Sequence, residues 1–302
     1  MNKNQSAKLD AKKIYNNRWK NSLSSGEYNI LHDGKPDTQV KYFYDLYCNF
    51  ILNQIKKVYP DRDLINLSIL EIGCGRGTAS IFLNKRLNCK SIGIDFSEVS
   101  IEIAKKNASF YKSNSKFFIA DIFDKNLFKN EFIGGEENFD VVISLGVLEH
   151  IESLEECLFI HNKLLKKEGL FCAMVVPEKK SIQDYFELLN KFLFRLNIIF
   201  DKQSKKKFNH LDKSLTKTND VFRTYKSSEY FGKCLRNAFF HDVITVESNP
   251  LPTIRPLNIL LEKLVVNFFI LFSKLYKQIF RKSLFFDCNE KLSRCHFLIG
   301  RK

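Results

Sequence analysis

The chain has 302 residues, a formal net charge of +14 and a hydrophobic fraction of 44%. This apolar content excludes a disordered polypeptide, and the length permits one elaborated domain or a domain with a cap. Residues 1–13 lack the apolar stretch of a signal peptide, and the eight cysteines form no C-x-x-C pair. We therefore expect a cytoplasmic protein with reduced thiols.

The positive charge is concentrated in two segments. Residues 201–226 carry eight Lys or Arg against three Asp or Glu, and residues 255–302 carry ten against three. A bias toward Lys codons would spread lysine over the whole surface. The uneven placement instead favours an anionic partner for these segments, and both interpretations stay open.

Between residues 67 and 176, short apolar strands alternate with glycine-containing turns and helices. Strands are expected at 68–72, 91–95, 116–120, 139–145 and 169–176, and helices at 78–87, 97–108 and 153–167. Strands and helices that alternate at this length indicate a parallel sheet covered by helices on both faces. The pattern predicts an α/β, doubly wound, Rossmann-like architecture.

The regular alternation stops after Pro177. Helices are expected at 181–200, 227–239 and 257–281, strands at 242–247 and 294–301, and an earlier helix near 39–58. We predict that residues 1–66 form an N-terminal helical cap. Residues 67–302 then form the main domain, with helical cap insertions at about 177–226 and 250–293.

The first strand ends in a glycine-rich turn, L-E-I-G-C-G-R-G-T. Gly73 and Gly75 would let a ligand approach the main chain, and the helix that follows offers unpaired N–H groups. The third glycine comes one residue earlier than in the dinucleotide fingerprint. Glu71, at the strand end, would repel a pyrophosphate but suits the amino group of an amino-acid-like ligand.

Acidic residues also end the next two strands. Asp95 lies 18 residues beyond Gly77, where a carboxylate can accept hydrogen bonds from ribose hydroxyls. Asp121 ends the third strand in A-D-I, where it could meet the exocyclic amine of an adenine. Any one of these acids could be a helix cap, but the ordered set predicts a nucleoside-type ligand at the carboxyl edge of the sheet.

These stretches resemble the class I S-adenosylmethionine-dependent methyltransferases over residues 67–176. The matching motifs are L-E-I-G-C-G-R-G-T, G-I-D-F-S, A-D-I, F-D-V-V-I-S-L-G-V-L-E-H-I and L-L-K-K-E-G-L-F. The resemblance implies S-adenosylmethionine as cofactor and a seven-stranded sheet whose last strand is antiparallel. The cofactor-binding residues that it implies are Glu71, Gly73, Cys74, Gly75, Asp95, Phe96, Asp121, Ile122 and Leu145.

Glu149 and His150 follow the fourth strand and are the candidate catalytic residues. His150 could act as a base near neutral pH, and Glu149 could orient it or bind the substrate. Alternatively, V-L-E-H-I is the start of a helix, with Glu149 near its positive end and His150 in contact with the cofactor or the backbone. Among relatives, the ubiquinone-pathway O-methyltransferases look closest here, and some hold a divalent metal with E-x-x-E-H. Gly146 replaces the earlier acid, so no metal is expected.

We expect methyl transfer to a small or lipid- or glycan-linked acceptor, at a hydroxyl oxygen. The alternatives are a non-catalytic cofactor-binding partner protein or an RNA methyltransferase, although nothing resembles an N-P-P-Y-type base-handling motif and no nucleic-acid partner is expected. Residues 257–281 predict a helix with a narrow polar stripe and a wide apolar face. That face requires a cover: the protein's own core, a second subunit, or a membrane surface in peripheral contact. The oligomeric state stays open.

Overall fold

The computed structural model describes residues 12–17, 19–20, 31, 34–59, 64–200, 222–254 and 257–302. The basic stretch 201–221 of the first predicted insertion lies outside the described residues, as does most of the segment that precedes residue 34. All further statements concern the described part of the chain.

Seven strands form one sheet in the order β3-β2-β1-β4-β5-β7-β6. They are β1 (Ser68–Ile72), β2 (Lys90–Asp95), β3 (Lys116–Ile119), β4 (Phe139–Leu145), β5 (Leu165–Val175), β6 (His241–Ser248) and β7 (Cys295–Arg301). Strands β1 to β5 pair in parallel, and β7 is antiparallel to both β5 and β6. The predicted doubly wound fold with an antiparallel last strand is confirmed.

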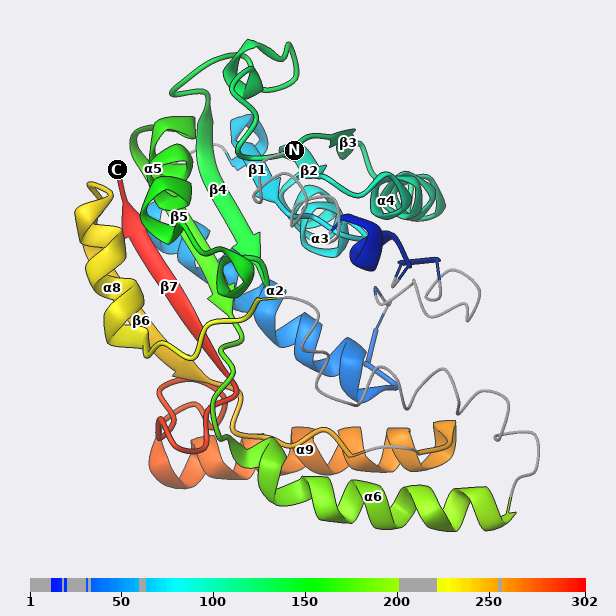
Figure 1. Cartoon of the computed structure of the whole chain (residues 1–302). Helices are drawn as coiled ribbons and strands as arrows, with labels where there is room; N and C mark the ends of the chain where they lie inside the picture. Colours follow the sequence, from blue (N-terminus) through cyan, green and yellow to red (C-terminus); the bar gives the residue numbers. More distant parts are fainter. Residues whose placement is uncertain are drawn as a thin grey trace.

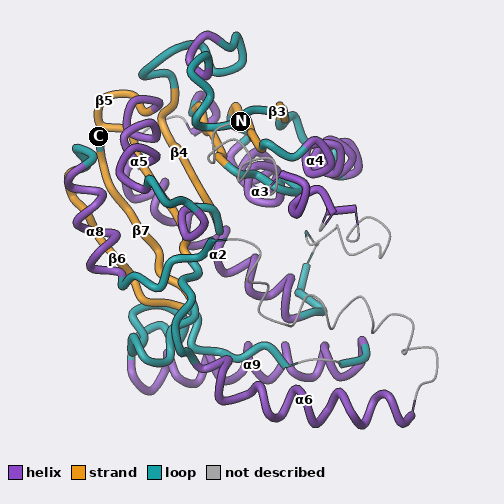
Figure 2. Tube along the Cα trace, viewed as in Figure 1, coloured by secondary structure: helices purple, strands orange, loops and turns teal. Residues whose placement is uncertain are grey.

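Of the described helices, five cover the two faces of this sheet (Figure 1; Figure 2). They are α2 (Gln39–Val58), α3 (Thr78–Leu87), α4 (Glu98–Phe110), α5 (Leu154–Leu164) and α8 (Ser228–Asn237), whereas α6 (Ile182–Phe200) and α9 (Ile259–Phe280) extend below the sheet (Figure 1). Buried residues of α2, α3 and α9 share one hydrophobic cluster with the sheet. Buried residues of α5 and α8 share a second cluster on the other face.

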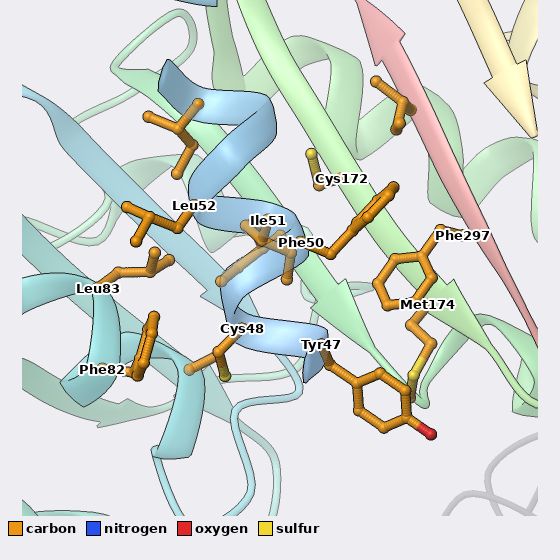
Figure 3. Close-up of a cluster of buried hydrophobic side chains, with 14 of the residues drawn as sticks. Tyr47, Cys48, Phe50, Ile51, Leu52, Phe82, Leu83, Cys172, Met174 and Phe297 are labelled. Atoms are coloured by element: carbon orange, nitrogen blue, oxygen red, sulfur yellow. The ribbon is translucent and has the colours of Figure 1, made fainter. Parts of the chain in front are cut away.

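Helix α2 forms much of the first cluster. Ile51 and Ile55 are completely buried, and Phe50 packs against Phe297 of β7 with ring centroids 4.5 Å apart. The close-up in Figure 3 shows α2 side chains directed toward Leu83 of α3 and Cys172 of β5. This helix therefore packs into the same core as the sheet.

One predicted boundary is wrong. The helix expected to run through residue 167 ends at Leu164, and the chain enters β5 at Leu165. Leu165 pairs with Phe139 of β4 and is completely buried, and Glu168 takes a positive φ of 60°. Sheet pairing and burial thus override the helical pattern of this segment.

The chain order reverses between β1 and β4. It proceeds from β1 through β2 to β3 on one side, and β4 then pairs with the opposite edge of β1. Doubly wound sheets bind ligands outside the carboxyl ends of the strands at such a switch point. Residues that follow β1, β2 and β4 are therefore the ones placed to form a site.

We predict that Ile51→Ala lowers the free energy of unfolding by about 2–5 kcal/mol, because it leaves a cavity in a fully buried position. Asn53→Ala, an exposed position on the same helix, is the control and should change it by less than about 0.5 kcal/mol. Chemical denaturation measures both. If Ile51→Ala and Asn53→Ala changed the free energy of unfolding equally, the role of α2 in the core would be contradicted.

Candidate functional site

The turn after β1 requires glycine at two positions. Gly73 has a φ of +70° and Gly75 a φ of +50°, the left-handed region that L side chains rarely adopt. A Cβ added to Gly73 would lie 2.2 Å from Cγ2 of Val147, and one added to Gly75 would lie 2.8 Å from the ring of Trp19. The side chains of Val147 and Trp19 therefore pack directly against the main chain of this turn.

Glu71 lies buried at the end of β1, only 3% exposed. Its Oε2 accepts hydrogen bonds from the main-chain N–H of Ser80, at 2.9 Å, and from the Ser80 hydroxyl, at 2.5 Å. Burial raises the pKa of this carboxyl to about 7, although both bonds act in the opposite direction. The carboxyl thus holds helix α3 against β1, and its predicted contact with a ligand amino group stays a prediction.

Asp95 joins the second strand to the glycine turn. Its Oδ2 accepts a hydrogen bond from the N–H of Gly75 at 3.0 Å, and its Oδ1 accepts one from the N–H of Ser97 at 2.8 Å. Burial raises the pKa of Asp95, and these two bonds oppose the shift. The side chain of Ser100 also donates to this carboxylate and lowers its pKa. An ionised carboxylate has about four acceptor positions, so Asp95 can accept at least one further hydrogen bond.

The other predicted binding residues lie around this edge. Phe96 is half-buried beside Asp95, and Leu145 is half-buried at the end of β4. Asp121 follows β3 and accepts a hydrogen bond from the N–H of Phe123, whereas Ile122 packs into the second hydrophobic cluster. Cys74 is buried, and burial raises the pKa of its thiol well above the usual value.

Residues 12–17 and 19–20 add contacts that the sequence did not predict. The ring of Tyr15 lies edge-on to Phe96, with centroids 5.6 Å apart, and 6.0 Å from that of His150. Trp19 lies over Gly75, and the guanidinium of Arg76 lies 5.4 Å from its ring centroid. The N-terminal segment therefore covers the glycine turn. In the sequence, this arrangement was indicated only by the four-residue spacing of Tyr15 and Trp19, which places both rings on one side of a helix.

Glu149 is 1% exposed and lies in a single 3-10 turn, Leu148–His150. Helix α5 begins only at Leu154, so the pair is not the start of that helix. Burial raises the pKa of the Glu149 carboxyl to about 7, while the charge of Arg223 acts in the opposite direction. Among the described residues, its Oε2 has no hydrogen-bond partner. This carboxyl lies near the balance between its two protonation states at neutral pH.

His150 is oriented by the main chain of the first insertion. Its Nδ1 lies 2.8 Å from the carbonyl oxygen of Phe222. Because a carbonyl only accepts, Nδ1 carries the hydrogen, and Nε2 of the neutral ring keeps its lone pair. Nε2 lies 4.0 Å from Oε1 of Glu149. The structure therefore brings the two predicted catalytic side chains together.

Within the described ranges, no group of three or more His, Cys, Asp or Glu side chains is arranged to hold a metal ion. Gly146 has a φ of +73°, and a Cβ added there would lie 3.7 Å from Oε1 of Glu149. This glycine supplies no carboxylate beside the pair, so the pattern E-x-x-E-H is incomplete.

Comparison with known families gives a match to the Methyltransferase domain family over residues 65–213, about half of the chain. A ubiquinone biosynthesis O-methyltransferase of Pelagibacter ubique is 28% identical over 161 residues, which cover 53% of this chain and 60% of that protein. A protein of the same description from Rickettsia bellii is 28% identical over 180 residues, which cover 60% of this chain and 65% of the relative. The chain thus spans less than two thirds of the length of these relatives.

Among solved structures, an S-adenosylmethionine-dependent methyltransferase from Archaeoglobus fulgidus aligns with 83% of this chain and 93% of its own. The identity is 16% and the TM-score is 0.44. A likeness of this degree carries no argument about the site. The fold itself rests on the strand order of this chain.

We predict that Glu149→Gln weakens the pH dependence of stability. The native carboxyl has a pKa of about 7 and the unfolded one about 4.5, so the stability that the bound proton provides is lost as the pH rises through 7. Thermal unfolding between about pH 5 and pH 8 should show the variant losing less stability than the wild type, by at most roughly 3 kcal/mol. Glu152→Gln, an exposed neighbour, is the control. Identical profiles for wild type and Glu149→Gln would contradict the raised pKa.

Proposed function

We infer that the chain, which belongs to the class I S-adenosylmethionine-dependent methyltransferases, transfers a methyl group to a hydroxyl oxygen of a small or lipid- or glycan-linked acceptor. The observation that carries this proposal is the hydrogen bond from Gly75 N–H to Asp95, because it joins the two cofactor motifs at the switch point of the sheet. The pair Glu149 and His150 at the adjacent strand end supports a proton transfer there.

The residues at this edge fit S-adenosylmethionine. Gly73 and Gly75 give the turn after β1 its left-handed backbone, and the amino-acid part of the cofactor would lie along this turn. Asp95 retains acceptor capacity for a ribose hydroxyl, since the bonds from Gly75, Ser97 and Ser100 leave at least one acceptor position. Phe96, with Tyr15 edge-on to it, offers an apolar surface to an adenine.

When bound, the cofactor supplies a methyl group already activated by a sulfonium. The protein must then hold the acceptor oxygen in line with that methyl group and exclude water from it. Trp19 and Tyr15 from the N-terminal segment cover the edge where this alignment takes place. Their apolar rings limit the access of water to the reacting atoms.

His150 is the base of the proposed reaction. The hydrogen bond from Nδ1 to the Phe222 carbonyl fixes the ring so that Nε2 can accept the proton of an acceptor hydroxyl. The imidazolium that results lies beside the Glu149 carboxyl, 4.0 Å away. Because that carboxyl is buried, its ionised form would stabilise the imidazolium more strongly than a solvated one.

The choice of a hydroxyl acceptor rests on this base and on relatives named as ubiquinone biosynthesis O-methyltransferases. Purified protein mixed with radiolabelled S-adenosylmethionine and separate panels of phenols, catechols, glycan intermediates and tRNA tests it. We expect labelled product with a phenol-type or glycan hydroxyl. Methylation of tRNA alone would contradict the acceptor class, and cofactor binding without any transfer would favour a non-catalytic protein.

We predict that Asp95→Ala weakens binding of S-adenosylmethionine by roughly 100-fold, because hydrogen bonds to a charged carboxylate are lost. Isothermal titration calorimetry measures the dissociation constant. Asp124→Ala removes an exposed carboxyl from the loop after β3 and should leave it unchanged. If both variants bind like the wild type, the assignment of Asp95 is wrong.

We predict that His150→Ala lowers kcat by roughly 10²–10⁴-fold, the usual contribution of a positioned base. The dissociation constant for S-adenosylmethionine should change little, since the proposed role begins after binding. His241→Ala, an exposed histidine on β6, is the matched control for activity. A variant at His150 with unchanged kcat would show that positioning alone sustains the transfer.

A further inference from the structure

Helix α9 exposes an apolar stripe along its length. Leu260, Leu264, Phe268, Leu271, Leu275 and Ile279 recur at spacings of three or four residues, so they lie on one side of the helix. All six are exposed, Phe268 by 61% and Ile279 by 70%. Large apolar side chains gathered in this way mark an interaction surface.

The opposite side of α9 is already packed against the protein. Phe269 is buried, with its ring centroid 6.1 Å from those of both Tyr42 and Phe43 of α2. Glu262 accepts a hydrogen bond from the N–H of Gln39 at 2.9 Å. The protein's own core therefore contacts only the inner side of α9. The outer stripe is available to a second subunit or a membrane surface.

Helix α6 lies close to the segment that leads into α9 and also exposes apolar side chains. Tyr185, Leu188 and Phe192 are exposed on one side of it, Leu188 by 77%. Gln183 and Asn190 each donate a hydrogen bond to the carbonyl of Thr253, in the segment that leads into α9. The two helices extend below the sheet (Figure 1). We call their exposed apolar residues the α6–α9 face.

Basic side chains flank the α9 part of this face, whereas α6 also carries Asp184, which accepts a hydrogen bond from the N–H of Ser181, and Glu187, which pairs with Lys191. Lys263, Lys274 and Lys277 are exposed, and their spacings of eleven and three residues bring them to one flank of α9. Arg281 and Lys282 are exposed at its carboxyl end. The one acidic residue of the helix, Glu262, is engaged with Gln39. An apolar face with a basic flank matches an anionic lipid surface, in which acyl chains lie beneath negatively charged headgroups.

We propose that the α6–α9 face docks the protein on the surface of an anionic lipid bilayer. The apolar stripe enters the boundary between headgroups and acyl chains, and the lysines contact the headgroups. A second copy of the chain fits less well, because it would present the same α9 face, whose one acidic residue, Glu262, is engaged with Gln39 and offers no complementary charge to the lysines. Charge complementarity therefore selects the lipid.

Docking has a consequence for the site that rests on the proposed function. Helix α6 follows the carboxyl end of β5, and α9 follows that of β6, which runs in the same direction because both strands are antiparallel to β7. Both helices thus leave the edge of the sheet where Asp95 and His150 lie. A bilayer against them brings lipid-linked hydroxyls to the side of the molecule that carries the site.

Co-sedimentation of the full chain with vesicles tests the docking. Wild type should pellet with vesicles of phosphatidylcholine and phosphatidylglycerol, and added salt should release it. Vesicles of phosphatidylcholine alone should retain much less. Absence of binding to the anionic vesicles would overturn the proposal.

Two variants separate the apolar and basic contributions. Leu264→Glu with Phe268→Glu should lower binding at least tenfold, since charge is introduced into the apolar stripe. Lys263→Gln, Lys274→Gln and Lys277→Gln together should also lower it at least tenfold, since each lysine near an anionic surface contributes about 1 kcal/mol. Phe110→Glu, a 73% exposed position at the end of α4, is the control and should bind like the wild type.

Binding of S-adenosylmethionine, measured by calorimetry, shows that each variant is folded. Because vesicle binding requires no methyl transfer, its result is independent of the proposed activity. Variants that bind vesicles as tightly as the wild type would overturn the proposal. A concentration-dependent dimer of the wild type, dispersed by Leu264→Glu with Phe268→Glu, would also overturn it, because the face would then be an interface between copies. Light scattering detects that dimer.

Discussion

A parallel sheet covered by helices on both faces leaves the ends of its strands as the place for polar chemistry. All five residues of β1 are buried, and the aliphatic run of β4 is buried as well. The carboxyl groups of Glu71, Asp95 and Glu149 accordingly lie at or just beyond strand ends. The same constraint places the two long insertions, because β5 and β6 both deliver the chain to that edge.

Burial has different consequences for the two glutamates at this edge. The pKa of each is raised to about 7 by burial. Glu71 is held by two hydrogen bonds from Ser80 and so fastens α3 to β1. The Oε2 of Glu149 has no such partner among the described residues, and its neighbour is the ring of His150. Main-chain hydrogen bonds from Glu149 and Val176 also reach the Glu149 carboxyl, so what distinguishes it from Glu71 is its place beside the His150 ring.

Much of this arrangement could be predicted from the sequence, because strand ends, glycine turns and acidic residues are local signals. The boundary of α5 was missed because the pairing of Leu165 with Phe139 depends on residues far apart in the chain. The contacts of Tyr15 and Trp19 were missed for the same reason, since they join the N-terminal segment to Phe96, Gly75 and His150. Nothing in the spacing of V-L-E-H-I indicated that Glu149 would be 1% exposed.

In the proposed complex, the carboxyl edge between β1 and β4 holds the methyl donor with its reacting end toward His150. A crystal structure of the protein with S-adenosylhomocysteine would show this placement. We expect a ribose hydroxyl within hydrogen-bond distance of Asp95, and the thioether sulfur on the same side as the His150 ring. A ligand bound elsewhere, or one whose sulfur points away from His150, would contradict it.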